Sequence, residues 1–185
     1  MNSLTQLLEA ALFSAAHPLS TEELARLQPD ASREELMTAV EELRQHYVEH
    51  GHAVELIEVA EGFQVVTQPR FADAVAEAQF VRRPRKLSRA ALETLAVIAY
   101  RQPVSRAEIE EIRGVSVEGV LRALQERGVV EVVGRAEGLG RPLLYGTTQA
   151  FLELLGLNSR DDLPKLEEMS VALRPLGEQS ELAEA

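Results

Sequence analysis

A repeat within the chain limits the possible folds more than any other feature of the sequence. When the sequence is shifted by 85 residues, HPLSTEEL at residues 17–24 lies over QPVSRAEI at residues 102–109, and the proline, the serine, a glutamate and the closing aliphatic residue coincide. The same shift aligns further pairs, namely Ala11 with Ala96, Leu12 with Val97, Leu36 with Leu121 and Glu41 with Glu126. A repeat fixes the architecture, so we expect two copies of one folded unit.

The first copy has the pattern of three helices followed by two strands. Apolar residues at a spacing of three and four predict a first helix with one buried face. They are Leu4, Leu7, Leu8, Ala11, Leu12 and Ala15. Ser20 with Glu23, and Ser32 with Glu35, have the capping-box spacing, which predicts that a helix begins after each serine. The runs AVELIEVA and FQVVTQ, separated by a Glu-Gly turn, predict a hairpin.

The second copy repeats this order with different residues. The apolar face of its first helix consists of Leu92, Leu95, Ala96 and Ala99. Ser105 with Glu108 forms the next capping box, a third helix buries apolar residues between positions 117 and 124, and VVEVV and LLYGTT are the strands. Three helices and a two-stranded ribbon make a winged helix-turn-helix. The predicted fold class is mainly α with small β-hairpins (α+β), with two tandem winged helix-turn-helix domains joined by a short linker.

Composition and charge divide the chain into four segments. Residues 1–78 are expected to form an N-terminal winged-helix domain, and residues 79–88 a basic linker that contains RRPRK. Residues 89–157 are expected to form a C-terminal winged-helix domain. Residues 158–185 are an acidic tail without a sustained apolar face, so we expect this tail to be largely disordered.

The charge of the third helix in each domain bears on nucleic-acid binding, because this helix enters the major groove when a winged helix reads DNA. Such binding depends largely on neutralising phosphates. SREELMTAVEELRQ carries two arginines and four glutamates, SVEGVLRALQER carries two of each, and the whole chain has a net charge of −11. These helices favour protein–protein contact. The alternative is a tandem winged-helix DNA-binding transcriptional regulator.

The sequence shows no recognisable catalytic, cofactor or metal site. The glycine-rich stretch VGRAEGLGRPLLYGTT, residues 133–148, lacks both the lysine-hydroxyl pair of a P-loop and the third glycine of a dinucleotide fold, so we interpret it as the tip of a wing. Ser116 misses the spacing of an esterase nucleophile elbow and suits a helix N-cap. His46 and His50 have a zinc-like spacing without a further ligand pattern. We therefore predict no enzyme activity, no cofactor and no metal.

The composition also bears on where the protein works. No apolar run approaches the roughly 20 residues that span a bilayer. The first twenty residues contain neither Lys nor Arg, which a targeting segment would carry. The chain has no cysteine, which excludes disulfides and fits a reducing compartment. We expect a soluble cytoplasmic protein that does not contact a membrane.

Residues 87–157 resemble the bacterial segregation and condensation protein B family. The most specific motifs are AYRQPVSRAEIEEIRG, VGRAEGLGRPLLYGTT, and FLELLGL followed by DDLPKL. The first copy resembles the family more loosely, in its apolar phasing and in LSTEEL, and the resemblance extends over residues 4–166.

This resemblance implies a non-catalytic subunit of the bacterial Smc condensin-like complex. It implies a homodimer formed by the N-terminal domains, and binding of the kleisin subunit, segregation and condensation protein A. The kleisin in turn bridges the heads of the Smc ATPase, so this chain would reach Smc and DNA only indirectly. The implied role is chromosome condensation and partition during cell division, at the nucleoid.

The sequence also suggests which residues make these contacts. For the kleisin we expect polar contacts from one group of side chains in the C-terminal domain: Tyr100, Arg101, Arg106, Arg135, Arg141 and Tyr145. For the homodimer the candidates are Leu4, Leu8 and Leu12 of the first helix. The same three leucines are equally suited to the core of their own domain.

Overall fold

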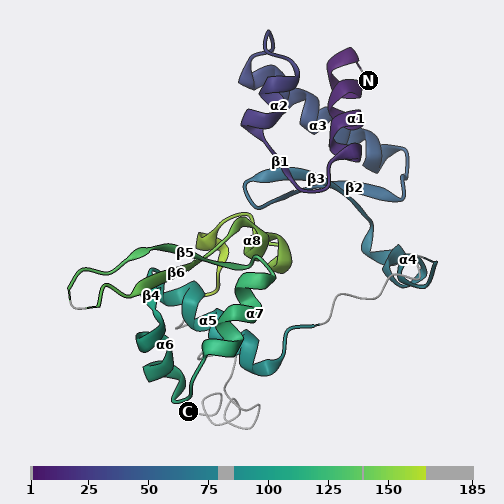
Figure 1. Ribbon diagram of the computed structural model, residues 1–185. Helices are drawn as coiled ribbons and strands as arrows, with labels where there is room; N and C mark the ends of the chain where they lie inside the picture. The colour runs from purple at the N-terminus through teal and green to yellow at the C-terminus, as the bar shows by residue number, and fades with distance from the viewer. Residues whose placement is uncertain (1, 79–85, 139, 166–185) are drawn as a thin grey trace, which may run out of the picture.

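The computed structural model describes residues 2–78, 86–138 and 140–165, and it confirms two winged-helix units (Figure 1). The first unit consists of α1 (Ser3–Ser14), β1 (Leu19–Ser20), α2 (Thr21–Leu27), α3 (Arg33–Glu49), β2 (Val54–Val59) and β3 (Gly62–Thr67), followed by η1 (Pro69–Phe71) and α4 (Ala72–Ala78). The second unit consists of α5 (Arg89–Arg101), β4 (Val104–Ser105), α6 (Arg106–Arg113), α7 (Glu118–Glu126), β5 (Val130–Arg135) and β6 (Leu143–Thr147), followed by α8 (Gln149–Leu155) and η2 (Arg160–Asp162).

The three predicted capping boxes are confirmed at the starts of α2, α3 and α6. In α6 the Ser105 hydroxyl accepts a hydrogen bond from the Glu108 N–H at 3.4 Å, and the Glu108 carboxylate accepts one from the Ser105 N–H at 2.7 Å. Hydrogen bonds from the serine hydroxyl and backbone hold the pKa of the Glu108 carboxyl below its ordinary value. Each box satisfies N–H groups that a helix start leaves without partners.

Each unit contains a three-stranded antiparallel sheet, where the sequence predicted two strands. The added strand is β1 in the first unit and β4 in the second, and each has two residues beside the hairpin. In the first sheet Leu19 pairs with Phe63, and in the second Val104 pairs with Tyr145. At Gly62 a Cβ atom would lie 3.0 Å from the Leu19 backbone, so a larger residue there would crowd this pairing.

The repeat has an offset of 85 residues from the short strand to the start of the third helix, as the sequence predicted. The first helices align differently, because the buried Thr5, Leu8 and Leu12 correspond to the buried Ala91, Thr94 and Ile98 at an offset of 86. The predicted pairing of Leu12 with Val97 is therefore one residue out. The first copy has one residue more between the helix core and the strand.

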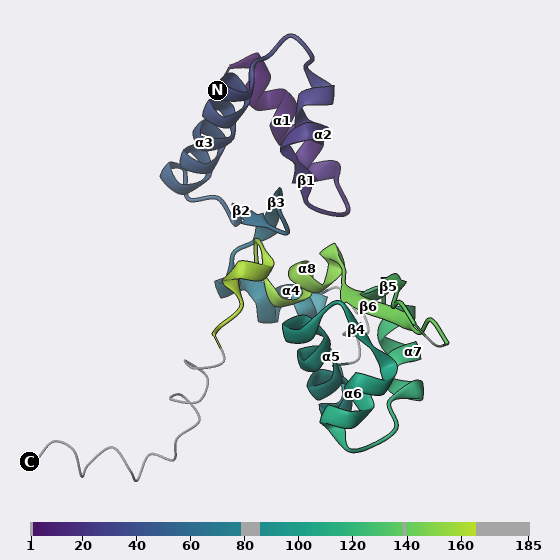
Figure 2. The same cartoon turned by 90° about the vertical axis from the view of Figure 1, so that its left-hand side faces the viewer.

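Each unit has a hydrophobic core of its own, and the two units also touch. One core is built on Leu8, Leu24, Leu36 and Leu43, and the other on residues such as Ile98 and Leu124. Val59 and Ala60, from the β2–β3 turn of the first unit, belong to the second core. Figure 2 shows this turn directed at the segment that follows α8.

The second unit extends beyond residue 157, where the sequence analysis placed its end. Residues 158–165, expected as the start of a disordered tail, include η2 and pack Leu163 against the second core. Most of the basic linker (residues 79–85) and of the acidic tail (residues 166–185) lies outside the described residues. Within the described part of the chain, no helix is both long and apolar enough to cross a membrane.

Candidate protein-binding surface

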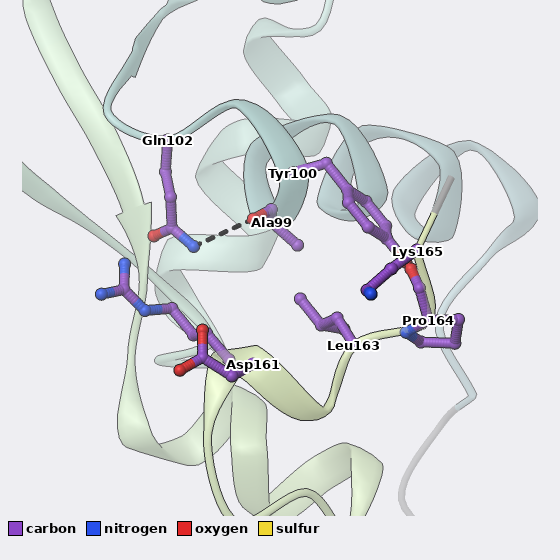
Figure 3. Close-up of a pocket in the computed structure, with 8 residues that line it drawn as sticks. Ala99, Tyr100, Gln102, Asp161, Leu163, Pro164 and Lys165 are labelled. Atoms are coloured by element: carbon purple, nitrogen blue, oxygen red, sulfur yellow. Dashed lines mark hydrogen bonds between the residues drawn. The ribbon is translucent and has the colours of Figure 1, made fainter. Parts of the chain in front are cut away.

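A groove of about 520 Å³ lies at the C-terminal end of α5 (Figure 3). One wall is the end of α5, and the other is the segment of residues 157–165, which we call the C-terminal strap. The groove is lined by Ala99, Tyr100, Gln102, Arg160, Asp161, Leu163, Pro164 and Lys165. Apolar side chains lie beside charged and amide groups here, which is the mixture that protein-binding surfaces use.

Tyr100 fastens the strap to the helix. Its hydroxyl donates a hydrogen bond of 2.6 Å to the Pro164 carbonyl, and Figure 3 shows its ring lying between α5 and the end of the strap. The half-buried ring also forms part of the lining of the groove. Tyr100 thus shapes one wall of the groove and also lines it.

Gln102 connects the groove to the second sheet. Its side-chain Oε1 accepts a hydrogen bond of 2.7 Å from the Thr147 N–H, and its Nε2 donates to the Ala99 carbonyl at 3.1 Å. Gly146 makes room for this contact, because a Cβ there would lie 2.9 Å from the Gln102 Oε1 and 2.8 Å from a Val133 methyl. No sequence motif pointed to Gln102 as a site residue, although this residue stands beside the proline of the repeat.

The structure does not bring the six predicted kleisin-contacting residues together. Of these six, only Tyr100 lines the groove. Arg101 is exposed on the last turn of α5, next to Tyr100 in the chain. Arg106 begins α6, where its guanidinium pairs with the carboxylates of Glu110 and Glu118, each at 3.3 Å.

The remaining three predicted residues belong to the second wing. Arg135 and Arg141 are exposed near its tip, and the Arg135 guanidinium donates a hydrogen bond of 3.4 Å to the Arg141 carbonyl. Tyr145 is only 8% exposed and is part of the second core. Tyr145 therefore stabilises the sheet from inside, and its ring offers a partner almost no surface.

The first helix offers a different apolar surface from the one predicted. Leu8 and Leu12 are 0% and 2% exposed and pack in the core of their own domain, and Leu4 is half-buried beside them. The exposed large apolar residues of α1 are Leu7 and, above all, Phe13, which is 79% exposed. An interface on this helix has to use the latter pair, because the leucine stripe is already covered.

The rings of three histidines near the end of α3 lie close together and are tilted relative to one another. The ring centroids of His46 and His50 are 4.2 Å apart, and those of His46 and His52 are 5.4 Å apart. Desolvation, and then the neighbouring His50 and His52, lower the pKa of His46. Across the described residues, no group of three or more His, Cys, Asp or Glu side chains is placed to hold a metal ion.

Comparison with known proteins gives consistent matches over both units. Residues 6–166 match a family described as Segregation and condensation complex subunit ScpB. Segregation and condensation protein B from Syntrophotalea carbinolica is 45% identical, over 90% of this chain and 84% of that protein. The protein of the same name from Moorella thermoacetica is also 45% identical, over 92% and 87%. A crystal structure described as a dimer of ScpB N-terminal domain complexed with ScpA peptide is 25% identical, over 40% of this chain and 91% of that one, with a TM-score of 0.37.

Proposed function

Because the chain belongs to the family of ScpB subunits of the segregation and condensation complex, we propose that it is a non-catalytic subunit that forms a homodimer and binds the kleisin subunit ScpA. Through the kleisin it reaches the Smc ATPase and, indirectly, DNA. In this role it acts in chromosome condensation and partition during cell division, in the cytoplasm at the nucleoid.

The observation that carries this proposal is the extent of the family match. The match spans residues 6–166, which include both winged-helix units and the C-terminal strap. The charge of the third helices also supports protein binding, because α3 carries more acidic than basic side chains. A phosphate backbone would be repelled by such a helix.

We place the kleisin contact at the groove beside α5. Leu163 and Pro164 provide apolar surface for a side chain of the bound segment, and Gln102 and Lys165 provide polar groups at its edge. Tyr100 and Arg101 remain the proposed partner-binding residues at this end of α5. Arg106, Arg135 and Arg141 are proposed as secondary contacts, whereas Tyr145 contributes through the core.

We place the homodimer contact on α1 in the N-terminal domain. Phe13 and Leu7 are its exposed apolar residues. Burying a phenylalanine side chain contributes about 1.5–3 kcal/mol, which is a substantial part of the free energy of a small interface. Leu4, at the edge of the core, is the one predicted leucine that retains partial exposure.

Co-purification with the kleisin, beside a duplex-DNA gel-shift series over increasing salt, tests the proposed function. We expect a stable complex with the kleisin and little DNA binding. Tight duplex binding that weakens steeply with salt, together with no kleisin complex, would establish the DNA-binding regulator instead. The Arg141→Glu variant tests whether the tip of the second wing contacts the kleisin. If its affinity for the kleisin is unchanged, the wing tip is not part of the contact.

A further inference from the structure

The tip of the first wing has an unusual backbone. Ala60 and Glu61, which connect β2 to β3, have φ values of 52° and 58°, in the left-handed region that non-glycine residues seldom occupy. A two-residue type I′ hairpin turn requires positive φ at both of its positions, and Val59 pairs with Gly62 across this one. The same turn makes its contacts with the second domain.

Hydrogen bonds from the second domain satisfy the backbone of the turn. The Ala60 N–H donates to the Leu157 carbonyl at 2.9 Å, and the Glu61 N–H donates to the Asn158 carbonyl at 3.0 Å and to the Asn158 Oδ1 at 2.9 Å. In the other direction, the Gln149 Nε2 donates to the Ala60 carbonyl at 2.7 Å. Both N–H groups and one carbonyl of the turn are therefore bonded across the domain boundary.

Apolar burial accompanies these hydrogen bonds. Val59 and Ala60 are 2% and 0% exposed and are part of the core of the second domain. Leu152 belongs to the same core, and Leu157 packs against it. The contact thus has an apolar, buried centre accompanied by hydrogen bonds, as protein interfaces have.

The receiving side is held in shape by its own hydrogen bonds. The Asp162 carboxylate accepts hydrogen bonds from the N–H groups of Asn158 and Ser159, at 2.9 and 2.8 Å. These bonds fix the start of the strap in front of η2. The Asn158 Nδ2 can then donate to the Glu58 Oε1 at 3.0 Å while its Oδ1 faces the turn.

We propose that the first wing is a docking element for the second domain. Its tip, Val59 to Glu61, binds to a surface formed by Gln149, Leu157 and Asn158. As a consequence, the two winged-helix domains move as one body in solution. A wing used in this way is not available to a nucleic acid. The inference does not depend on the kleisin and can fail or stand independently of the proposed function.

We call the contact of the wing tip with Gln149, Leu157 and Asn158 the joint. Measuring a distance between the two domains tests whether the joint holds them together. The chain has no cysteine, so two introduced cysteines are the only sites that take a spin label. We use Thr38→Cys in the first domain and Gln125→Cys in the second, both at exposed positions. Because the chain is proposed to form a homodimer, the labelled chain is mixed with an excess of unlabelled chain, so that only distances within one protomer are measured. We expect one narrow distance distribution. In the Gln149→Ala, Asn158→Ala double variant we expect the distribution to broaden about two-fold or more, because loosely joined domains move relative to each other.

Glu153→Ala is the matched control, because Glu153 is exposed on α8 and its side chain is outside the joint. Its distribution should stay narrow. A broad distribution in the parent chain, or a narrow one in the folded double variant, overturns the proposal. Hydrogen exchange gives a second readout that applies even if the double variant is unstable: in the parent chain the amides of Ala60 and Glu61 should be protected, and rapid exchange at both overturns the joint.

Discussion

At the scale of single residues, Gln102 has more structural influence than its sequence context suggests. Its amide joins the end of α5 to β6 through Ala99 and Thr147. Replacing it by alanine leaves the Thr147 N–H without this partner. A polar group left unsatisfied costs about 1–3 kcal/mol.

We therefore predict that Gln102→Ala lowers the free energy of unfolding by roughly 1–3 kcal/mol. Chemical denaturation of the variant and parent chains measures this difference. Gln125→Ala, at an exposed position on α7, is the control and should change the free energy by less than about 0.5 kcal/mol. Equal effects of the two substitutions would contradict the structural role of Gln102.

The capping carboxylate Glu108 makes a prediction about pH. Because hydrogen bonds from Ser105 lower the pKa of Glu108 in the folded chain, its stabilising effect is complete above the ordinary carboxyl pKa and is lost as the pH falls through the lowered value. Glu108→Gln should destabilise the protein at neutral pH, and the difference from the parent chain should shrink in acid.

Unfolding titrations at about pH 7 and about pH 3.5 check this expectation. Glu111→Gln is the matched control, because Glu111 is an exposed residue of the same helix, α6. It should leave the stability nearly unchanged at both values. A Glu108→Gln effect that is as large in acid as at neutral pH would show that the charge of the carboxylate is not what matters.

At the scale of elements, α1 contributes some apolar residues to the core of its domain and exposes others, a distinction that its sequence pattern does not show. Leu8 lies in the core, whereas Phe13, on the same helix, is exposed. Leu8→Ala should lower the free energy of unfolding by about 2–5 kcal/mol, and Phe13→Ser should leave it almost unchanged.

Phe13→Ser also tests the proposed dimer contact. If α1 forms this contact, the substitution should shift the chain from dimer toward monomer in sedimentation experiments. A fully dimeric Phe13→Ser protein would move the interface away from this helix.

The elements also show what the sequence can predict. The starts of α2, α3 and α6 follow from a serine and a glutamate three residues apart, so local chemistry is sufficient to find them. The strands β1 and β4 are too short to have a pattern, and they exist because of pairing with residues about 40 positions away. The C-terminal strap has no periodicity, and its residues from 158 onward were assigned to the acidic, largely disordered tail; in the structure, tertiary contacts through Leu163 and Tyr100 hold the strap. The candidate groove could not be predicted, because the strap forms half of it.

At the scale of the whole molecule, the C-terminal strap links the two features that this fold adds to a pair of winged helices. At one end, Leu157 and Asn158 receive the first wing. At the other end, Pro164 accepts the hydrogen bond of Tyr100 and closes the groove. Arg160, between them, lines both the groove and a smaller cavity of about 200 Å³ beside Ala60 and Gln149.

This arrangement predicts that domain docking and kleisin binding are coupled, given that the kleisin binds at the groove. If the groove is complete only when the first wing is bound to the strap, loss of this contact lowers the fraction of molecules that can bind the kleisin. The apparent affinity for the kleisin then falls in proportion to that fraction. We expect the Gln149→Ala, Asn158→Ala double variant to bind the kleisin several-fold more weakly in calorimetry, although neither residue lines the groove. Glu153→Ala should bind normally.

Coupling of this kind is reciprocal: if domain docking favours kleisin binding, kleisin binding must favour domain docking. This reciprocity distinguishes coupling from direct damage to the groove. If the kleisin prefers the docked strap, then adding kleisin to the spin-labelled double variant must narrow its broadened distance distribution. A variant that merely distorts the groove would bind weakly and stay broad after saturation. Normal affinity in a variant with a broadened distribution would show that the groove forms without the joint, and the two features would then be independent.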